Sequence, residues 1–251
     1  LTGRTRFILA GAVAVLIAAA VACLFTLQQN GTTIYVNPAA TGAGDGSSWR
    51  DACRDLQAGL DTAEPGDEVR VSAGEYDLEL LTVPAGVRII GGLAHDTAGA
   101  AATVITGDVR VAGAGTTVFR GVEARGVVYA EQGAGIQMAE ATAQPVDVQI
   151  ALNNTDGQAA GVKVLSPTTE RELGEATTDA AVAMQIADNA GHDVYLQATA
   201  ERLPDGKVFS RWLNQDGECL GTEPTLKLDV TKTTVVKATF ADVYYVSTAS
   251  G

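Results

Sequence analysis

Eight carboxylates between residues 67 and 123 are the side chains whose type and spacing could support chemistry. They are Asp67, Glu68, Glu75, Asp77, Glu79, Asp96, Asp108 and Glu123. Pairs of carboxylates cleave glycosidic bonds, and other enzymes of sugar polymers combine acids with a Lys or Arg base and calcium. The spacing groups none of these acids beyond the density of an ordinary surface, and residues 31–145 contain no Lys. We therefore assign no catalytic residue from the sequence.

Metal and cofactor chemistry has equally little support. Asp45 and Asp51 in a glycine-rich loop could bind calcium, but the twelve-residue order of an EF-hand is absent. Cys53 and Cys219 fit no zinc motif. The sequence also lacks a nucleophile elbow, a phosphate-binding loop and a His-Glu-x-x-His motif. We assign no cofactor-binding or metal-binding residue, leave calcium open, and favour a protein without catalytic activity while an enzyme remains the alternative.

The charge balance excludes two classes of partner. The chain has 17 Lys and Arg against 30 Asp and Glu, which gives a formal net charge of −13. Nucleic acid binding needs clustered Lys and Arg, and anionic lipid surfaces attract basic segments. We therefore expect no nucleic acid partner and no electrostatic docking on lipid, and solubility is the simplest reason for the acidity.

Residues 1–30 form a separate apolar segment. Phe7–Leu27 is an apolar run of 21 residues that follows Arg4 and Arg6. A basic flank before such a run is typical of export, and about 20 helical residues span a bilayer. We expect a signal peptide or an uncleaved signal-anchor helix. The protein would then be extracellular or on the cell surface, held to the membrane by this helix if it is not cleaved.

Two alternatives remain for the same segment. Cys23 directly follows the small-x-small stretch of residues 20–22, so a lipidated cysteine would also suit the sequence. The helix could instead be the packing helix of a pilus-like filament subunit, and we rank this interpretation below the anchor.

Residues 31–145 are predicted to form short strands between tight turns. A helical stripe from Trp49 to Ala63 follows Ser48 and Asp51, which resemble a capping box. Short apolar strands are predicted at Val69–Val71, Val87–Ile89, Val104–Ile105, Val109–Val111, Val118–Phe119 and Val127–Tyr129. Short strands punctuated by Gly suit a solenoid, and the helix would cover its exposed end.

The order of motifs in this region resembles the opening of pectate-lyase-like parallel β-helix proteins, which include many bacterial surface proteins. The matching pieces are Tyr35-Val36, Gly44–Trp49, Ala52–Gln57, Pro65-Gly66-Asp67, Val69–Val71, Ala73–Tyr76 and Val83–Gly92. Leu93 replaces an aromatic of the family pattern, and Cys53 stands where Phe is common. The resemblance implies a short right-handed parallel β-helix over residues 31–145 with an N-terminal capping helix. It makes Trp49 an anchor of that cap, with sugar stacking as the alternative.

Residues 146–241 have the alternating pattern of a small β-sandwich-like domain. Apolar residues alternate over Val194–Ala198, Leu226–Val230 and Val236–Phe240. The stretch Thr168–Thr178 is rich in Glu and Thr, and we predict it to be an exposed loop. The fold class is therefore all-β throughout residues 31–241.

This second region resembles the bacterial repeat domains of surface proteins, of the internalin B-repeat-like kind. The matching pieces are Gly191–Ala198, Gly206–Trp212, Leu228–Val230 and Val236–Phe240. Such modules act as stalk or spacer units and occur in adhesins. The resemblance implies a spacer here, and the strand alternation places Phe209 and Trp212 in its core.

The last residues repeat a pattern seen near the start. Tyr244–Gly251 echoes Ile34–Gly42, and Tyr35 and Tyr245 are 210 residues apart. We interpret residues 242–251 as the start of a further, truncated module, and the chain, which begins at Leu, as a fragment of a longer array. An ordinary C-terminal strand would explain the same ten residues.

Two functions from different classes fit these features. The first is a secreted or surface-anchored structural or adhesin-type protein without catalytic activity, whose partners would be cell-wall or host glycans or proteins. The second is a carbohydrate-active enzyme or glycan-binding module on a β-helix, which depends on fold analogy alone. The filament subunit is a third alternative.

Overall fold

The protein is all-β over the residues that the computed structural model describes, as the sequence predicts. These are residues 31–93, 102–139, 145–153, 160–178, 182–188, 193–200 and 202–243. The expected N-terminal helix with Cys23, the candidate acid Asp96 and the echo at residues 244–251 lie outside them. Among the described residues, no helix has the length and apolarity that a membrane crossing requires.

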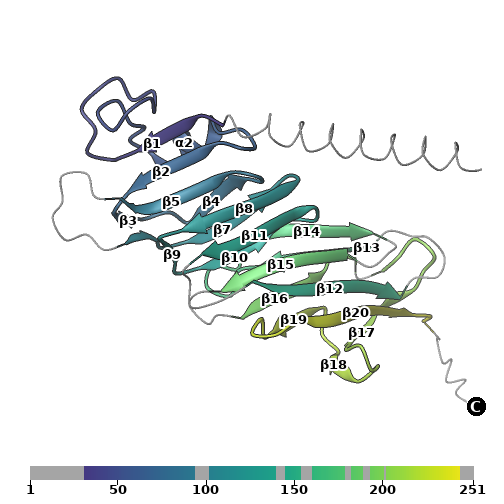
Figure 1. Cartoon of the computed structure of the whole chain (residues 1–251). Helices are drawn as coiled ribbons and strands as arrows, with labels where there is room; N and C mark the ends of the chain where they lie inside the picture. The colour runs from purple at the N-terminus through teal and green to yellow at the C-terminus, as the bar shows by residue number, and fades with distance from the viewer. Residues whose placement is uncertain are drawn as a thin grey trace, which may run out of the picture.

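The first half of the described chain winds through three parallel sheets. Sheet A holds β1 (Thr33–Val36), β2 (Glu68–Ser72), β5 (Arg88–Leu93), β8 (Gly115–Arg120) and β11 (Ala134–Ala139). Sheet B holds β3 (Gly74–Tyr76), β6 (Thr103–Ile105) and β9 (Val122–Ala124). Sheet C begins with β4 (Leu80–Pro84), β7 (Asp108–Ala112) and β10 (Val127–Ala130). Three passes of the chain, β2–β4, β5–β7 and β8–β10, each add one strand to each sheet, and β1 and β11 are the end strands of sheet A. Figure 1 shows the stack.

Aliphatic side chains fill the space between these sheets. Val69, Ile89 and Phe119 occupy the same register position on β2, β5 and β8, and all three are buried. Each fully buried side chain of this kind stabilises the fold by about 1.5–3 kcal/mol relative to an exposed one. The predicted apolar strands all lie on observed strands, although β5 begins one residue after Val87.

The predicted helix of residues 49–63 is wrong in length. The observed helix, α2, covers only Leu56–Asp61, and its N-cap is Asp55, whose side chain accepts a hydrogen bond from the Ala58 N–H. Ser48 and Asp51 do bond to each other, but they close a turn. The helix cannot start earlier because Cys53 pairs with β1: the Cys53 N–H donates to Tyr35, and the Cys53 carbonyl accepts from Asn37.

Two of the three outer strands at this end of the stack, β1 and β4, have backbone groups bound by other segments. The loop that ends at Cys53 lies along the free edge of β1, where the Tyr35 N–H also donates to the Gly46 carbonyl over 2.9 Å. On the edge of sheet C, the Gln57 side chain binds both backbone groups of Thr82 on β4, each over 2.9 Å. The amide of Gln57 thus takes the place of one residue of a further strand.

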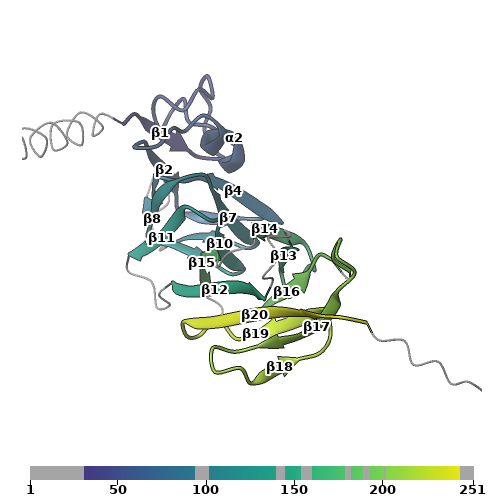
Figure 2. The same ribbon diagram turned by 90° about the vertical axis from the view of Figure 1, so that its right-hand side faces the viewer.

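The second half of the chain extends sheet C and adds a fourth sheet. Sheet C continues from β10 through β15 (Val182–Asp188), β12 (Val146–Asn153), β20 (Thr234–Ala241) and β17 (Val208–Leu213) to β18 (Cys219–Gly221). Sheet D is antiparallel and consists of β14 (Glu172–Thr178), β13 (Ala160–Leu165), β16 (Val194–Ala198) and β19 (Thr225–Leu228). Figures 1 and 2 show the body running from β1 and α2 at one end to β18 at the other.

Sheet D packs on sheet C through a second apolar core. Trp212 is completely buried there, as predicted, and its indole N–H donates to the Glu223 carbonyl over 3.0 Å. Phe209, also predicted for the core, is only partly buried but packs on Trp212 with ring centroids 5.4 Å apart.

The predicted loop Thr168–Thr178 is wrong over most of its length, because residues 172–178 form β14 at the edge of sheet D. Leu173 and Ala176 are buried, whereas Glu172 and Glu175 are exposed. A register shift at Val164/Leu165 of the neighbouring strand breaks the strict alternation. Charged residues are common on edge strands because they prevent pairing with other chains. The glutamates of β14 therefore made this strand look like an exposed loop in the sequence.

We predict that Gln57→Ala lowers the free energy of unfolding by about 1–3 kcal/mol, because the variant leaves the Thr82 N–H and carbonyl without protein partners. Chemical denaturation followed by circular dichroism measures this change. Gln215→Ala, at an exposed turn, is the matched control and should change stability by less than about 0.5 kcal/mol. Equal effects of the two variants would contradict the role of Gln57.

Candidate functional site

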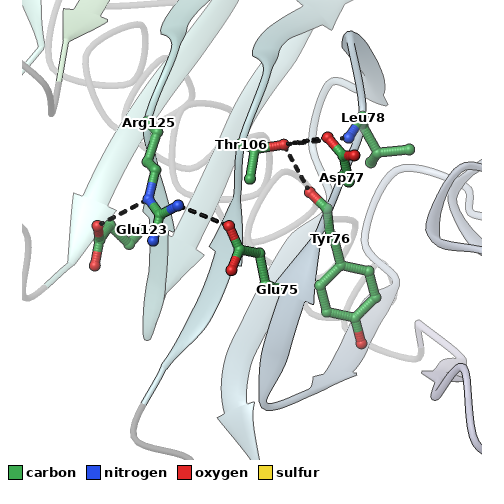
Figure 3. A network of polar contacts seen from close by, with 7 residues as sticks. All are labelled: Glu75, Tyr76, Asp77, Leu78, Thr106, Glu123 and Arg125. Carbon is green, nitrogen blue, oxygen red and sulfur yellow. Dashed lines mark hydrogen bonds and ion pairs between the residues drawn. The ribbon is translucent and has the colours of Figure 1, made fainter.

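Three of the candidate acids come together on the outer face of sheet B. Glu75 on β3 and Glu123 on β9 flank Val104 of β6 in register. Arg125 lies between them, 2.7 Å from a Glu75 oxygen and 4.0 Å from a Glu123 oxygen (Figure 3). Asp77 lies beside them and accepts a hydrogen bond of 3.0 Å from the Thr106 hydroxyl.

This sheet B cluster consists of exposed ion pairs. The side chains of Glu75 and Arg125 are 57% and 52% exposed, and exposed pairs contribute about 0–1 kcal/mol each to stability. Both glutamates are held beside the same guanidinium, so neither is presented as a free acid or base. Within the described residues no group of three or more His, Cys, Asp or Glu is arranged to hold a metal ion. The cluster ties β3 to β9 across the face of the sheet.

Asp67 has a structural role in the Pro65-Gly66-Asp67 turn. Its carboxylate accepts three hydrogen bonds, from the Thr32 N–H and hydroxyl and from the Glu64 N–H, over 2.7–2.9 Å. Burial alone would raise the pKa of Asp67, but the hydrogen bonds from Glu64 and Thr32 outweigh it and lower that pKa. The charged carboxylate therefore fastens the start of β1 to the 64–67 turn.

Asp108 is a second buried carboxylate, 2% exposed at the start of β7. One oxygen accepts a hydrogen bond of 2.9 Å from the Val127 N–H. The other, Oδ2, is the one buried side-chain nitrogen or oxygen in the described part of the chain without a hydrogen-bond partner. Among the described residues, no second acid or base forms a hydrogen bond or ion pair with Asp108.

The other candidate acids form ion pairs. Glu68 is bound by Arg70 and Arg88 over 2.6 and 3.2 Å. Glu79 is bound by Arg171, which lies 92 residues further along the chain. These pairs connect neighbouring strands and the two halves of the chain. The candidate acids that the structure describes are therefore not grouped as in a reaction centre.

The loop considered for calcium is closed by its own hydrogen bonds. Asp45 accepts from the Ser47 N–H over 2.9 Å, and these hydrogen bonds from Ser47 lower the pKa of the exposed Asp45. The two Asp51 oxygens accept from the Ala43 N–H and the Ser48 hydroxyl. The Trp49 ring packs edge-on against Tyr35, with centroids 5.0 Å apart. The aspartates and Trp49 therefore hold the loop over β1.

The two body cysteines are both free thiols. Cys53 is buried beneath the loop and Cys219 is exposed on β18. Burial, together with the nearby charge of Asp45, raises the pKa of the Cys53 thiol, which disfavours the nucleophilic thiolate.

A groove that the sequence did not predict lies on the outer face of sheet D. It has a volume of about 570 Å³, and its lining comes from all four strands and from the turn that precedes β14. The lining residues are Lys163, Leu165, Glu170, Glu172, Tyr195, Gln197 and Thr225. Ligand pockets usually measure about 300–1,000 Å³, so the groove has a suitable size.

Cross-strand register places the groove residues in two rows. In the first row, Lys163 lies opposite Gln197, and Gln197 lies opposite Thr225. In the second row, Leu165 lies opposite Tyr195. Val194, Leu196 and Ala198 point the other way into the core, so Tyr195 and Gln197 face the groove. The rows form a platform with an apolar centre and polar flanks.

Opposite charges meet across this platform. Lys163 binds Glu172 over 2.6 Å, and the bond to Glu172 raises the pKa of the Lys163 ammonium. Lys227, next to Tyr195 on β19, binds Asp193 over 2.5 Å, and that contact likewise raises the pKa of Lys227. The ammonium groups therefore remain charged and paired.

One rim residue has an unusual backbone conformation. Glu170 has φ 53°, the one positive φ at a non-glycine residue in the described chain. The Glu170 N–H donates to the Ser166 carbonyl over 3.0 Å, which holds the turn in place. Such conformations are costly and concentrate at functional sites, because the surrounding structure must enforce them.

The groove could not be found from any motif in the sequence. Its residues are spread over 63 positions, from Lys163 to Thr225, and no two of them share a recognisable signature. The sequence does contain one signal for the groove. Apolar residues alternate over Val194–Ala198, and this alternation predicts that Tyr195 faces outward. That alternation identifies an exposed aromatic residue without identifying its neighbours.

A second hollow, of about 430 Å³, lies where β11 meets β12 and β15. Much of its lining is glycine, and its main polar group is already engaged, since the Gln185 side-chain oxygen accepts from the Ile136 N–H over 2.8 Å. Gln185 thus covers the free edge of β11, and we interpret this hollow as part of the strand-edge packing.

No known protein family, curated protein or solved structure matches this chain. The resemblances drawn from its motifs therefore remain predictions.

We predict that Asp67 makes the protein sensitive to acid. Its folded pKa lies below the unfolded value of about 3.9, so its contribution is complete above about pH 4 and is lost as the pH falls through the folded pKa. Asp67→Asn should therefore weaken the fold at neutral pH and flatten the loss of stability below about pH 4. Urea denaturation from pH 2 to pH 7 measures both effects.

The matched control is Asp216→Asn, because Asp216 is exposed at a turn. This variant should keep the acid dependence of the parent chain. An Asp67→Asn variant whose stability fell with acid as steeply as that of the parent would contradict the prediction.

Proposed function

We propose that this chain is a non-catalytic structural or adhesin-type protein of the cell surface or extracellular space, in which one rigid body holds other modules apart. The observation that carries the proposal is the continuity of sheet C, whose eight strands run from β4 in the first half to β18 in the second. A spacer needs a fixed orientation between its ends. A shared sheet provides this better than a flexible linker would.

The junction between the halves supports the proposal in detail. β10 pairs with β15 antiparallel over four residues, from Val127 with Asp188 to Ala130 with Gln185. The Tyr129 ring lies against Gly174 of sheet D, where a Cβ atom would come within 2.2 Å of it. Burial, with the nearby charge of Glu131, raises the pKa of Tyr129 to about 12, so the phenol stays neutral in this joint.

The proposal includes a finer description of the fold. The three parallel sheets would be a short right-handed parallel β-helix of the pectate-lyase-like kind over residues 31–145, with α2 and its preceding loop as the cap. Residues 146–241 would be a bacterial repeat domain of the internalin B-repeat-like kind. The Gly66 φ of 103° in the Pro65-Gly66-Asp67 turn and the burial of Trp212 are consistent with these assignments.

The distribution of charge also favours a structural role over catalysis. Among the described candidate acids, Glu68, Glu75, Glu79 and Glu123 are paired with Arg, and Asp67 is bound in a turn. Asp77 and Asp108 accept hydrogen bonds from Thr106 and from the Val127 N–H. The proposed surface location depends on residues 1–30 as a signal or anchor helix, and cell-wall or host glycans or proteins are the proposed partners.

We predict that the two halves unfold together. Hydrogen exchange measured at increasing denaturant should show peptides from β5 and from β20 losing protection at the same midpoint, because sheet C connects their cores. Ala187→Pro, opposite Val128 in the pairing of β15 with β10, places a residue without an N–H in this ladder and should separate the two midpoints.

Ala187→Gly is the control for this variant, because it keeps the N–H and should lower stability modestly while leaving one midpoint. Two separate midpoints in the parent chain would contradict the rigid spacer.

The absence of catalysis is tested directly. The chain, incubated with a panel of plant and bacterial polysaccharides with and without calcium, should release no reducing ends and no unsaturated products. Cleavage that is lost in Glu75→Gln or Glu123→Gln would overturn the proposal in favour of a carbohydrate-active enzyme.

A further inference from the structure

The groove on sheet D has an apolar centre. Tyr195 is half-buried and Leu165 lies opposite it on the adjacent strand. A ligand that covers this centre must have a face without charge and without strong hydrogen-bonding groups. The ring of a sugar has such a face, made of C–H groups, and it stacks on an aromatic side chain.

The polar side chains around this apolar centre suit the hydroxyl groups at the edge of a sugar ring. The Gln197 amide and the Thr225 hydroxyl each both donate and accept hydrogen bonds, as sugar hydroxyls do. Lys163 and Glu172 add a donor and an acceptor that remain in place because they bind each other. A polyol can bind all of these groups without displacing either member of the ion pair.

The charges of the groove select against acidic ligands. Lys163 and Lys227 are neutralised by Glu172 and Asp193, and exposed Glu170 adds a negative charge on the rim. An acidic ligand would meet this carboxylate and an acidic protein of net charge −13. An extended peptide that adds to a sheet needs an unpaired strand edge, whereas the groove crosses the faces of four strands.

We propose that the outer face of sheet D is a binding site for a neutral oligosaccharide, stacked on Tyr195 and held by Gln197, Thr225 and the Lys163–Glu172 pair. The Ser166–Arg171 turn positions Glu170 at its rim through the strained backbone described above. The inference deepens the adhesin part of the proposed function. It rests on that function only for the surface location at which the protein would encounter the glycan.

The test is binding of the full chain to an array of neutral, acidic and basic oligosaccharides, followed by calorimetric titration with neutral hexose and pentose oligomers. We expect saturable binding to at least one neutral oligomer. Tyr195→Ala should weaken it at least about tenfold through loss of the stacking surface, while Tyr195→Phe should retain most of the affinity. Gln197→Ala should weaken it about fivefold or more through loss of its hydrogen bonds.

Gln215→Ala and Lys232→Ala are matched controls at exposed positions outside the groove and should bind as the parent chain does. Circular dichroism of each variant confirms that it is folded. Binding confined to acidic or basic ligands, no saturable binding to any neutral oligomer, or equal affinity of the parent and Tyr195→Ala would overturn the inference. The spacer role would survive each of these results, because it is measured by unfolding in the absence of ligand.

Discussion

The fold depends on satisfying the backbone hydrogen-bonding groups of strands at the edges of its sheets. An all-β body built by stacking has an exposed edge at each end, and every unpaired N–H and carbonyl there attracts another chain. At one end the loop before Cys53 covers β1, and Gln57 binds both backbone groups of Thr82 on β4. At the other end of the stack, β15 pairs with β10 and Gln185 covers β11.

This constraint joins the two halves of the molecule. Because β15 belongs to the second half and completes the edge of β10 in the first, the same hydrogen bonds that protect the stack also fix the orientation of sheet D. The Arg171–Glu79 pair and the contact of Tyr129 with Gly174 reinforce that junction from the side. The rigidity that we propose for the spacer would therefore follow from edge protection.

The charged residues of the first half and those of the groove on sheet D differ in their surroundings. In the first half, most of the described candidate carboxylates bind Arg residues or turn N–H groups, so their hydrogen bonds serve the fold. On sheet D, Lys163 and Glu172 are also paired, but they flank an apolar centre at Tyr195 that is partly exposed. The difference lies in what surrounds the ion pair, which is why sheet D and not sheet B provides the candidate binding site.

The sequence by itself determined the all-β class, the apolar strands from Val69 to Tyr129 and the burial of Trp212, because these depend on side-chain alternation and on turns within a few residues. It gave no signal for β3 or β9, which have three residues each, and it misassigned β14 and the start of α2. Those elements depend on distant partners: Cys53 is held by β1, and β14 is held by β13. The groove on sheet D has the same origin, since only pairing of four strands brings Lys163, Tyr195 and Thr225 together. Local pattern fixed which residues face the core, and long-range hydrogen bonding decided which outward-facing residues became neighbours.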